Sequence, residues 1–348
     1  MAINFYPLKL KQKDRLTADS TAFHFEVPSK HQDVFQFIPG QYLTLKTVID
    51  GLEERRSYSI CQPKLTDTIS VAVKRLDGGK MSNWLIDHLS LGMKLEIMPP
   101  QGLFTSSTSK STTKGLFLIA AGSGITPIMA ILEDALLNSD VHIHLLYGNR
   151  DEKSIMFSNR LAELTLDFPD RFHAQHYLTQ PEVEGFEALG RIDDTKLEQY
   201  LGDNNLESKN LEYYLCGPQT MVEIVFNHIR AKGVKEESIH RELFYVEEKE
   251  QETPQNSDQK PVNITVILED EEMPLVVEPY QTILQAMLEA GMDAPFSCQG
   301  GICATCMGKV LSGSVTMKEN MALTDGQVED GYVLGCQSIP TEGTIIEF

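Results

Sequence analysis

The sequence predicts a multidomain fold: an antiparallel β-barrel, then an α/β doubly wound parallel sheet, then a small α+β domain. Three observations lead to this prediction. Short strand-like runs between Gly and Pro turns fill the first third of the 348 residues. Strand and helix patterns alternate in the middle, and four of the six cysteines gather near the end. A chain of this length can supply the cores of two or three domains.

The first predicted domain, the barrel, comprises residues 1–106. Its apolar runs are short and are separated by turns rich in Gly and Pro, which is typical of an antiparallel barrel. The runs are Phe23–Val27, Tyr42–Val48, Arg56–Ile60, Thr68–Lys74 and Lys94–Met98. The Ser- and Thr-rich stretch Thr105–Thr113 is expected to be an exposed connector.

The second predicted domain comprises residues 107–246. It begins with a buried strand over Gly115–Ala121, a glycine turn over Gly122–Pro127 and a helix over Ile128–Leu137, with Pro127 expected at the first helical position. This order aims backbone N–H groups and a helix N-terminus at a phosphate. Strand and helix patterns then alternate over Val141–Tyr147, Ile155–Leu166, Phe172–Leu178, Glu212–Cys216 and Gln219–Lys232. Such alternation indicates a parallel, doubly wound sheet.

Residues 247–261 are predicted to be a flexible, charged linker, because they show no apolar periodicity. The last domain, residues 262–348, holds thirteen Asp and Glu against two Lys, a net charge of −11. Such an acidic surface either steers a basic partner or simply keeps the domain in solution.

The last domain is expected to open with a hairpin formed by Asn263–Leu268 and Leu275–Val277. A capping box at Thr282 and Gln285 then starts a helix, and Gly291 ends it. A small sheet with one covering helix and a cysteine loop is the pattern of a ferredoxin domain.

The four cysteines of this domain follow the spacing C-x4-C-x2-C with a distant fourth, which is the ligand pattern of a plant-type [2Fe–2S] cluster. They are Cys298, Cys303, Cys306 and Cys336. Gly300 and Gly301 allow the loop to turn tightly and bring backbone N–H groups near the sulfides. The alternatives are a zinc site, which usually presents two C-x2-C pairs, and four buried thiols without a metal.

Composition bears on the class of function. A net charge of −20 argues against nucleic-acid binding. No apolar leader follows Met1 and no apolar window of about 18 residues occurs, so neither export nor membrane spanning is expected. Six cysteines, four of them in the cluster pattern, suit a reducing compartment, and we expect a cytoplasmic protein.

Four further motifs carry chemistry only in combination. Arg56–Ser59 offers an Arg for a pyrophosphate, a Tyr for ring stacking and a Ser for a flavin nitrogen, and Gly79–Ser82 offers backbone donors to the same phosphate. Gly122–Pro127 and Cys216–Pro218 end strands of the parallel sheet, where such sheets bind ligands. Each alone also fits an ordinary strand, a turn or a buried thiol.

Electron counting joins these motifs to the cluster. A nicotinamide coenzyme gives up two electrons at once as a hydride, whereas a [2Fe–2S] cluster accepts one. A flavin between them can hold the second electron, so the chain is predicted to be an NAD(P)H-dependent flavin/iron–sulfur oxidoreductase. A di-iron oxygenase centre needs two Glu-x-x-His motifs. Only Glu237–His240 fits that motif, so an oxygenase is expected on separate chains.

These motifs resemble the ferredoxin–NADP reductase superfamily with a C-terminal plant-type ferredoxin domain, over essentially the whole chain. Among these reductases they are most similar to the group that serves phenylacetyl-CoA epoxidases. The segments that carry the resemblance are Arg55–Cys61, Ala120–Pro127, Tyr147–Arg150, Gly190–Asp193 and Gly300–Cys306. The resemblance implies an FAD-binding barrel, an NAD(P)-binding sheet and a β-grasp ferredoxin domain. It further implies electron flow from NADPH through FAD and [2Fe–2S] to the epoxidase of aerobic phenylacetate degradation.

The resemblance also implies roles for single residues. The catalytic residues would be Tyr58, Ser59, Thr126 and Cys216. Flavin and its pyrophosphate would contact Arg56, Ser57, Tyr58, Ser59, Val73, Lys74, Gly79, Lys80, Met81, Ser82 and Phe244. The coenzyme would contact Gly122, Gly124, Thr126, Pro127, Arg150, Cys216, Gly217 and Pro218. Arg150 lies where a cation binds the 2′-phosphate of NADPH, but Asp151 and Glu152 follow it and weaken that preference.

Two other interpretations stay open at this stage. The acceptor could be another ring hydroxylase or a steroid hydroxylase, because reductases of such systems share most of these motifs. Alternatively, the chain could be a non-catalytic flavin/iron–sulfur redox sensor. In the oxygenase case the partner is expected to dock on the acidic ferredoxin domain, and neither a nucleic acid nor a membrane is expected as a partner.

Overall fold

The computed structural model describes residues 4–106, 115–183, 188–244 and 260–348. Residues 6–54 and 58–244 form the larger of two compact units, and residues 4–5, 55–57 and 260–348 belong to the smaller one. The expected linker lies almost entirely outside the described residues, as does most of the expected connector at Thr105–Thr113. Among the described helices, none has the length and apolar character needed to cross a membrane.

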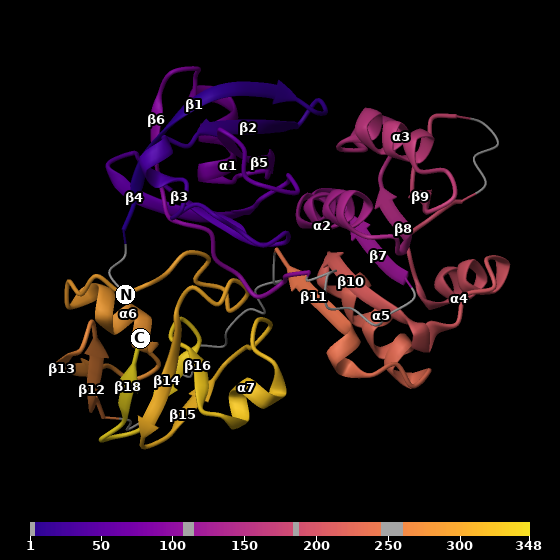
Figure 1. The fold of residues 1–348 in the computed structure, drawn as a ribbon. Coiled ribbons are helices and arrows are strands. Elements are labelled where there is room, and N and C mark those ends of the chain that lie inside the picture. The colour runs from indigo at the N-terminus through magenta and orange to yellow at the C-terminus, as the bar shows by residue number, and fades with distance from the viewer. Residues whose placement is uncertain (1–3, 107–114, 184–187, 245–259) are drawn as a thin grey trace. The chain divides into compact units, whose positions relative to one another are not determined.

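The first part of the larger unit is the expected antiparallel barrel, with strand order β4-β3-β6-β1-β2-β5 (Figure 1). Its strands are β1 (Tyr6–Arg15), β2 (Ser20–Glu26), β3 (Tyr42–Ile49), β4 (Leu52–Ser59), β5 (Thr68–Lys74) and β6 (Lys94–Ile97). A bridge between Ile60, just past β4, and Val71 of β5 brings the two edges of the sheet together. The interior is filled by fully buried apolar side chains such as Phe23, Phe25 and Leu43.

The second part of the larger unit is a five-stranded sheet whose neighbouring strands are all parallel, in the order β11-β10-β7-β8-β9. Its strands are β7 (Gly115–Ala121), β8 (His142–Asn149), β9 (Phe172–Leu178), β10 (Leu211–Gly217) and β11 (Ile239–Leu243). Because the chain returns from β9 to β10 on the far side of β7, the strand order reverses between β7 and β10. That reversal point is where doubly wound sheets bind ligands.

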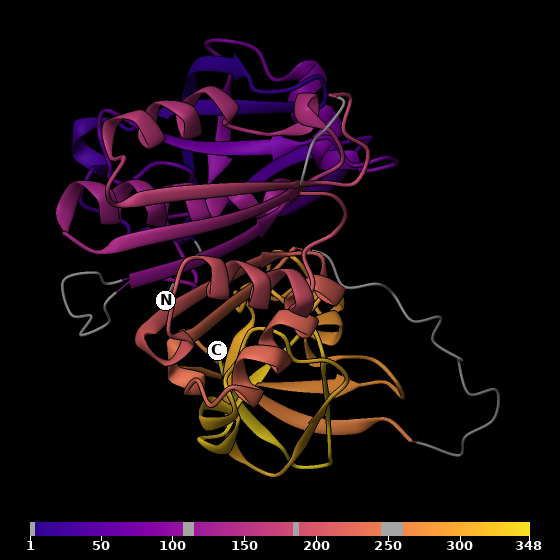
Figure 2. The same ribbon diagram turned by 90° about the vertical axis from the view of Figure 1, so that its right-hand side faces the viewer.

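Four helices cover this sheet, two on each face (Figures 1 and 2). They are α2 (Ile125–Asn138) and α3 (Ser158–Asp167) on one face, and α4 (Asp194–Asp203) and α5 (Gln219–Ala231) on the other. The doubly wound prediction is therefore confirmed. Pro127 was expected to be the first residue of its helix, which was wrong. The helix begins at Ile125, so Pro127 is the third residue, still inside the first turn where its missing N–H has no intrahelical partner.

The barrel and the parallel sheet share one apolar core. Ala22, Ala72 and Phe104 from the barrel part belong to the same buried cluster as the apolar residues of α2 and β7, and Leu16 packs against it. Burial of apolar surface across this boundary makes the two parts one compact unit. The barrel can thus place its own residues beside the carboxyl edge of the sheet.

The smaller unit is an α+β domain with a mixed sheet in the order β13-β12-β18-β14-β16 and a second sheet of β15 and β17. Its strands are β12 (Val262–Leu268), β13 (Glu271–Val277), β14 (Met307–Ser312), β15 (Val315–Met317), β16 (Tyr332–Leu334), β17 (Ser338–Pro340) and β18 (Ile345–Glu347). Its helices are α6 (Ile283–Glu289) and α7 (Asp325–Glu329). The predicted hairpin is confirmed, as is the capping box of Thr282 and Gln285.

Candidate functional site

The glycine turn sits at the reversal point of the parallel sheet. Gly122–Gly124 form a short 3-10 turn that joins β7 to α2. A Cβ atom on Gly124 would lie 2.2 Å from the carbonyl oxygen of Cys216, which is far inside van der Waals contact. Only glycine therefore fits at position 124. The glycine turn and the Cys216–Pro218 segment, predicted separately, are in direct backbone contact.

This turn presents backbone donors. The first turn of α2 has no side-chain cap. Within it the Ile125 N–H donates to the Gly122 and Ser123 carbonyls and Pro127 has no N–H, so the other backbone N–H groups of the turn are the candidate donors to a ligand. The Thr126 hydroxyl donates to the Ser123 carbonyl at 3.1 Å and so stays inside the turn. Gly122 adopts the left-handed conformation, with φ of +54°. A helix N-terminus of this kind suits the pyrophosphate of a nicotinamide coenzyme.

The segment Cys216–Pro218 lies against the glycine turn at Gly124. Cys216 is fully buried, and this burial, with Glu242 facing it on β11, raises the pKa of the thiol. The sulfur therefore stays protonated and is a poor nucleophile. Pro218 is the N-cap of α5, so a second helix N-terminus begins at the same edge. Phe244, one residue past β11, is 37% exposed.

Arg150 lies immediately after β8 with a side chain that is 67% exposed. Its Nε donates to Asp151 at 2.8 Å, and this bond raises the pKa of Arg150. The two acidic neighbours are committed to backbone donors. Asp151 accepts the N–H of Ser154 at 2.9 Å, and Glu152 accepts the N–H groups of residues 182 and 183. Asp151 is therefore an N-cap, which leaves the outer edge of the guanidinium open.

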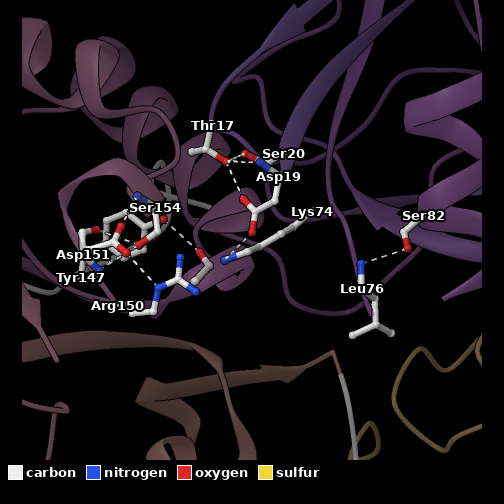
Figure 3. A network of polar contacts seen from close by, with 11 residues as sticks. Thr17, Asp19, Ser20, Lys74, Leu76, Ser82, Tyr147, Arg150, Asp151 and Ser154 are labelled. Carbon is white, nitrogen blue, oxygen red and sulfur yellow. Dashed lines mark hydrogen bonds and ion pairs between the residues drawn. The ribbon is translucent and has the colours of Figure 1, made fainter. Parts of the chain in front are cut away.

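A turn of the barrel faces Arg150 (Figure 3). Asp19 lies between β1 and β2, where it accepts a hydrogen bond from Thr17 at 2.7 Å and pairs with Lys74 at 3.7 Å. Its charge also raises the pKa of Arg150, to a smaller extent than Asp151 does. Lys74 was predicted as a flavin contact. The structure places its amine beside Asp19 and close to Arg150, so two cations and two carboxylates share this corner.

The Arg-Ser-Tyr-Ser motif occupies the C-terminal half of β4. Arg56 is exposed and donates to the Arg55 carbonyl, Ser57 and Tyr58 are half-buried, and Ser59 is buried. The Ile60–Val71 bridge continues this strand alongside β5, whose Val73 side chain packs in the barrel core. If Val73 contacts a cofactor, its backbone must therefore make the contact.

The second predicted flavin motif is a helix N-terminus that the sequence did not reveal. Gly79 is the N-cap of α1 (Lys80–His88), which has no side-chain cap. The Ser82 hydroxyl accepts the N–H of Leu76 at 3.2 Å (Figure 3), and Met81 packs in the barrel core. Lys80 pairs with Glu54 at 3.1 Å. A pyrophosphate bound at this position would meet the backbone N–H groups in the first turn of α1, which has no side-chain cap.

The four predicted cluster ligands come together in the smaller unit as two pairs. Their side chains interact as Cys298 with Cys303 and Cys306 with Cys336, and this interaction lowers the pKa of Cys303 and of Cys336. Polar donors also approach the sulfurs. The Gly300 N–H lies 3.4 Å from Cys298, and Thr305 lies 3.1 Å from Cys303.

This pairing fits a two-iron cluster, in which four thiolates are divided between two irons. Among the described residues, no three His, Cys, Asp or Glu side chains gather closely enough to hold one metal ion. A [2Fe–2S] cluster needs only two thiolates per iron, so the two observations agree. Bound there, the cluster would supply a one-electron carrier.

Comparison with known families gives three adjoining matches. Residues 7–105 match the oxidoreductase FAD-binding domain, residues 118–227 the oxidoreductase NAD-binding domain, and residues 266–341 the 2Fe-2S iron-sulfur cluster binding domain. Together they form the ferredoxin reductase type of architecture, and they match the barrel, the parallel sheet and the cysteine domain described above.

Named relatives extend over nearly the whole chain. It is 37% identical to a component of the 1,2-phenylacetyl-CoA epoxidase of Escherichia coli (strain K12), over 99% of this chain and 98% of that protein. It is 34% identical to the ferredoxin reductase component of 3-ketosteroid-9-alpha-monooxygenase of Rhodococcus rhodochrous, over 95% of this chain and 93% of that one. Glycine betaine monooxygenase reductase subunit of Chromohalobacter salexigens is 29% identical over 90% of this chain and 88% of its own.

Solved structures agree at the level of the fold. Phthalate dioxygenase reductase superimposes with a TM-score of 0.62 at 24% identity, over 99% of this chain and 98% of that one. An intact type IV self-sufficient cytochrome P450 monooxygenase gives a TM-score of 0.74 at 22% identity, over 99% of this chain and 40% of that one.

Proposed function

Because this chain belongs to the ferredoxin reductase type of oxidoreductases that serve oxygenases, we propose that it carries electrons from NADPH through FAD and a [2Fe–2S] cluster to a phenylacetyl-CoA epoxidase. The observation that carries the proposal is the backbone contact between Gly124 and Cys216 at the reversal point of the sheet. It joins two coenzyme motifs in one unit with the barrel. Bound FAD would accept two electrons as a hydride and release them singly.

Arg150 supports NADPH as the donor. Its guanidinium is two-thirds exposed, while the carboxylates of Asp151 and Glu152 are held by backbone N–H groups. A 2′-phosphate could therefore form a charge-assisted hydrogen bond with Arg150. The ribose of NADH has no such phosphate and would gain nothing from this cation.

Anaerobic stopped-flow spectroscopy tests this donor. Flavin absorbance should bleach before the cluster absorbance, and faster with NADPH than with NADH. Arg150→Gln should lower kcat/KM for NADPH about tenfold, as expected when one charge-assisted hydrogen bond is lost, and leave NADH unchanged. Arg230→Gln, an equal charge change on α5, serves as the control. Equal rates with both coenzymes, or an Arg150 variant that affects both alike, would contradict the choice of NADPH.

The first relative named above supports the epoxidase as acceptor, and the steroid monooxygenase reductases are the second candidate. We propose that the oxygenase docks on the ferredoxin domain, because the −11 charge of residues 262–348 would steer a basic surface. The cytoplasm is the proposed compartment, since the thiols must stay reduced until the cluster is in place.

Reconstitution with purified oxygenase components decides between these acceptors. NADPH oxidation should be coupled to epoxidation of phenylacetyl-CoA and should slow as salt is added. Efficient coupling to a ketosteroid hydroxylase instead would replace the epoxidase assignment. Coupling that is insensitive to ionic strength would remove the acidic docking surface from the proposal.

A further inference from the structure

A buried tyrosine lies directly beneath the glycine turn. Tyr147 is fully buried in β8, paired in register with Ala120 of β7. Its hydroxyl donates to the carbonyl of Gly122 at 3.0 Å. Figure 3 shows it in the same corner as Arg150 and Asp151. Burial raises the pKa of Tyr147, so the phenol stays protonated and remains a donor across the physiological pH range.

Two hydroxyls hold two successive carbonyls of the turn. Tyr147 holds that of Gly122, and Thr126 holds that of Ser123 at 3.1 Å. In a planar trans peptide the C=O and the following N–H point in opposite directions. With both carbonyls held by the protein, the N–H groups of Ser123 and Gly124 must point the other way, toward the proposed pyrophosphate position.

Gly122 is the flexible residue whose following peptide this hydrogen bond restrains. It adopts φ of +54°, and a Cβ placed on it would meet no atom within 4 Å. No packed atom stands where a side chain of residue 122 would lie, and glycine populates several backbone regions at similar cost, so the orientation of the following peptide depends on the hydrogen bonds made to its carbonyl. Ile125 also donates its N–H to this carbonyl from within the turn. Tyr147 is the donor anchored in the sheet.

We propose that Tyr147 is a positioning residue for the coenzyme: its hydroxyl fixes the Gly122–Ser123 peptide so that the Ser123 N–H is presented to the pyrophosphate. The inference rests on the proposed function, in which this turn binds the coenzyme. The expected signature is in binding. Without the hydroxyl the turn would sample other peptide orientations, and the coenzyme would have to order it.

Tyr213 provides a matched control. It is fully buried in β10 of the same sheet, and its hydroxyl donates to the Ser208 carbonyl at 3.2 Å, before the strand and away from the turn. Tyr147→Phe removes a buried phenol hydroxyl that bonds the Gly122 carbonyl and also interacts with Asn149 and the Met156 backbone, and Tyr213→Phe removes one that bonds the Ser208 carbonyl. A purely structural role predicts the same behaviour for both.

The experiment measures flavin reduction by NADPH in the full-length, cofactor-loaded protein, together with the Kd of NADP⁺ and thermal stability. Tyr147→Phe should raise KM and Kd roughly three- to tenfold, the usual effect of losing one hydrogen bond, while the limiting rate at saturating coenzyme stays near that of the wild type. Both variants should lower thermal stability by a similar amount. Tyr213→Phe should leave KM and Kd unchanged. Unchanged KM in Tyr147→Phe, or an equal rise in both variants, would overturn the inference.

Ser123→Asp separates this inference from the proposed function. Ser123 is half-buried in the turn, and a carboxylate there would repel a pyrophosphate. KM should rise more than in Tyr147→Phe. If Ser123→Asp leaves KM unchanged, the proposed coenzyme position is wrong and the role of Tyr147 falls with it. If it raises KM while Tyr147→Phe does not, only the role of Tyr147 is wrong.

Discussion

The glycine turn of the larger unit and the cysteine loop of the smaller one hold their ligands in different ways. The glycine turn lies between a fully buried strand and a 14-residue helix, and its shape is set by backbone and hydroxyl contacts. The cysteine loop has no regular structure between Cys298 and Cys306, and two non-glycine residues in it, Gln299 and Ala304, adopt positive φ angles of 55° and 56°. The glycine turn is shaped by regular elements on both sides, whereas the cysteine loop relies on backbone conformations that are costly for non-glycine residues.

Loss of one thiolate should have the largest effect and should separate the two sites completely. Cys303→Ser should abolish the cluster absorbance and all electron transfer that passes through it, because each iron needs both of its thiolates. NADPH should still bleach the flavin, since the glycine turn lies in the other unit. Absorption spectra and anaerobic flavin reduction measure both effects. Cys61→Ser, at a cysteine in the barrel part, is the control and should keep the cluster.

A methyl group at Gly124, where the glycine turn contacts Cys216, should have the next largest effect. In Gly124→Ala the new Cβ would lie 2.2 Å from the Cys216 carbonyl oxygen, so the two segments must separate. Such overpacking should raise the coenzyme KM roughly tenfold or more while the cluster spectrum stays unchanged. Steady-state kinetics with the purified protein measures this KM. An unchanged KM would show that the contact between Gly124 and Cys216 does not shape the coenzyme site.

The histidine contribution to acid sensitivity should be confined to one unit, because all nine histidines precede residue 245. His144 is buried between Phe117 and His173, and burial, followed by the charges of His173 and His142, lowers its pKa from 6.5 to about 4. The unfolded chain therefore takes up this proton first. Its stabilising effect is fully present above pH 6.5 and is lost progressively as the pH falls toward 4.

Two spectroscopic probes distinguish the units in this experiment. Trp84, the only tryptophan, lies in α1 and reports on the larger unit, while visible circular dichroism of the cluster reports on the smaller. The denaturation midpoint from Trp84 fluorescence should fall between pH 6.5 and 4. His144→Phe should flatten that fall, and His142→Gln should change it only slightly, because the charge of His142 is the last of the three causes of the low pKa of His144. An equal acid step in the cluster signal would argue against a histidine origin.

The smallest effect is expected at a glycine that touches nothing. A Cβ on Gly202, in the last turn of α4, would meet no atom within 4 Å, and the residue has ordinary helical backbone. Gly202→Ala should stabilise the larger unit by roughly 0.5–1 kcal/mol and leave the coenzyme KM unchanged. Chemical denaturation followed by Trp84 fluorescence measures this. A destabilised variant would contradict the contact geometry.

Sequence patterns predicted the elements whose apolar residues repeat clearly. Thr68–Lys74 and Phe172–Leu178 coincide with β5 and β9, and the fold class of each domain is confirmed. Strand β1 was not predicted, because lysines at 9, 11 and 13 alternate with only two buried leucines, Leu8 and Leu10. Helix α1 was not predicted, since glycine at its N-cap offers no capping side chain as a signal.

The site residues were predicted from motifs, and their assignment to cofactors stays a prediction. The motifs could not show which of them contact one another in the folded protein. The contact of Gly124 with Cys216 joins positions 92 residues apart in sequence, and the Asp19–Lys74 pair beside Arg150 depends on barrel packing. Tyr147 did offer a signal: a tyrosine that follows the apolar pair Leu145 and Leu146 in a buried strand must find a hydrogen-bond partner for its hydroxyl.

The confinement of all four cluster thiols to the smaller unit has a consequence for biosynthesis. The four predicted ligands all lie within residues 260–348, so a cluster bound by them would need no thiolate from the barrel or the parallel sheet, and its insertion would not have to wait for flavin. Maturation of the protein then depends on two separate supplies. A cell short of iron would accumulate chains that are complete in one unit and vacant in the other.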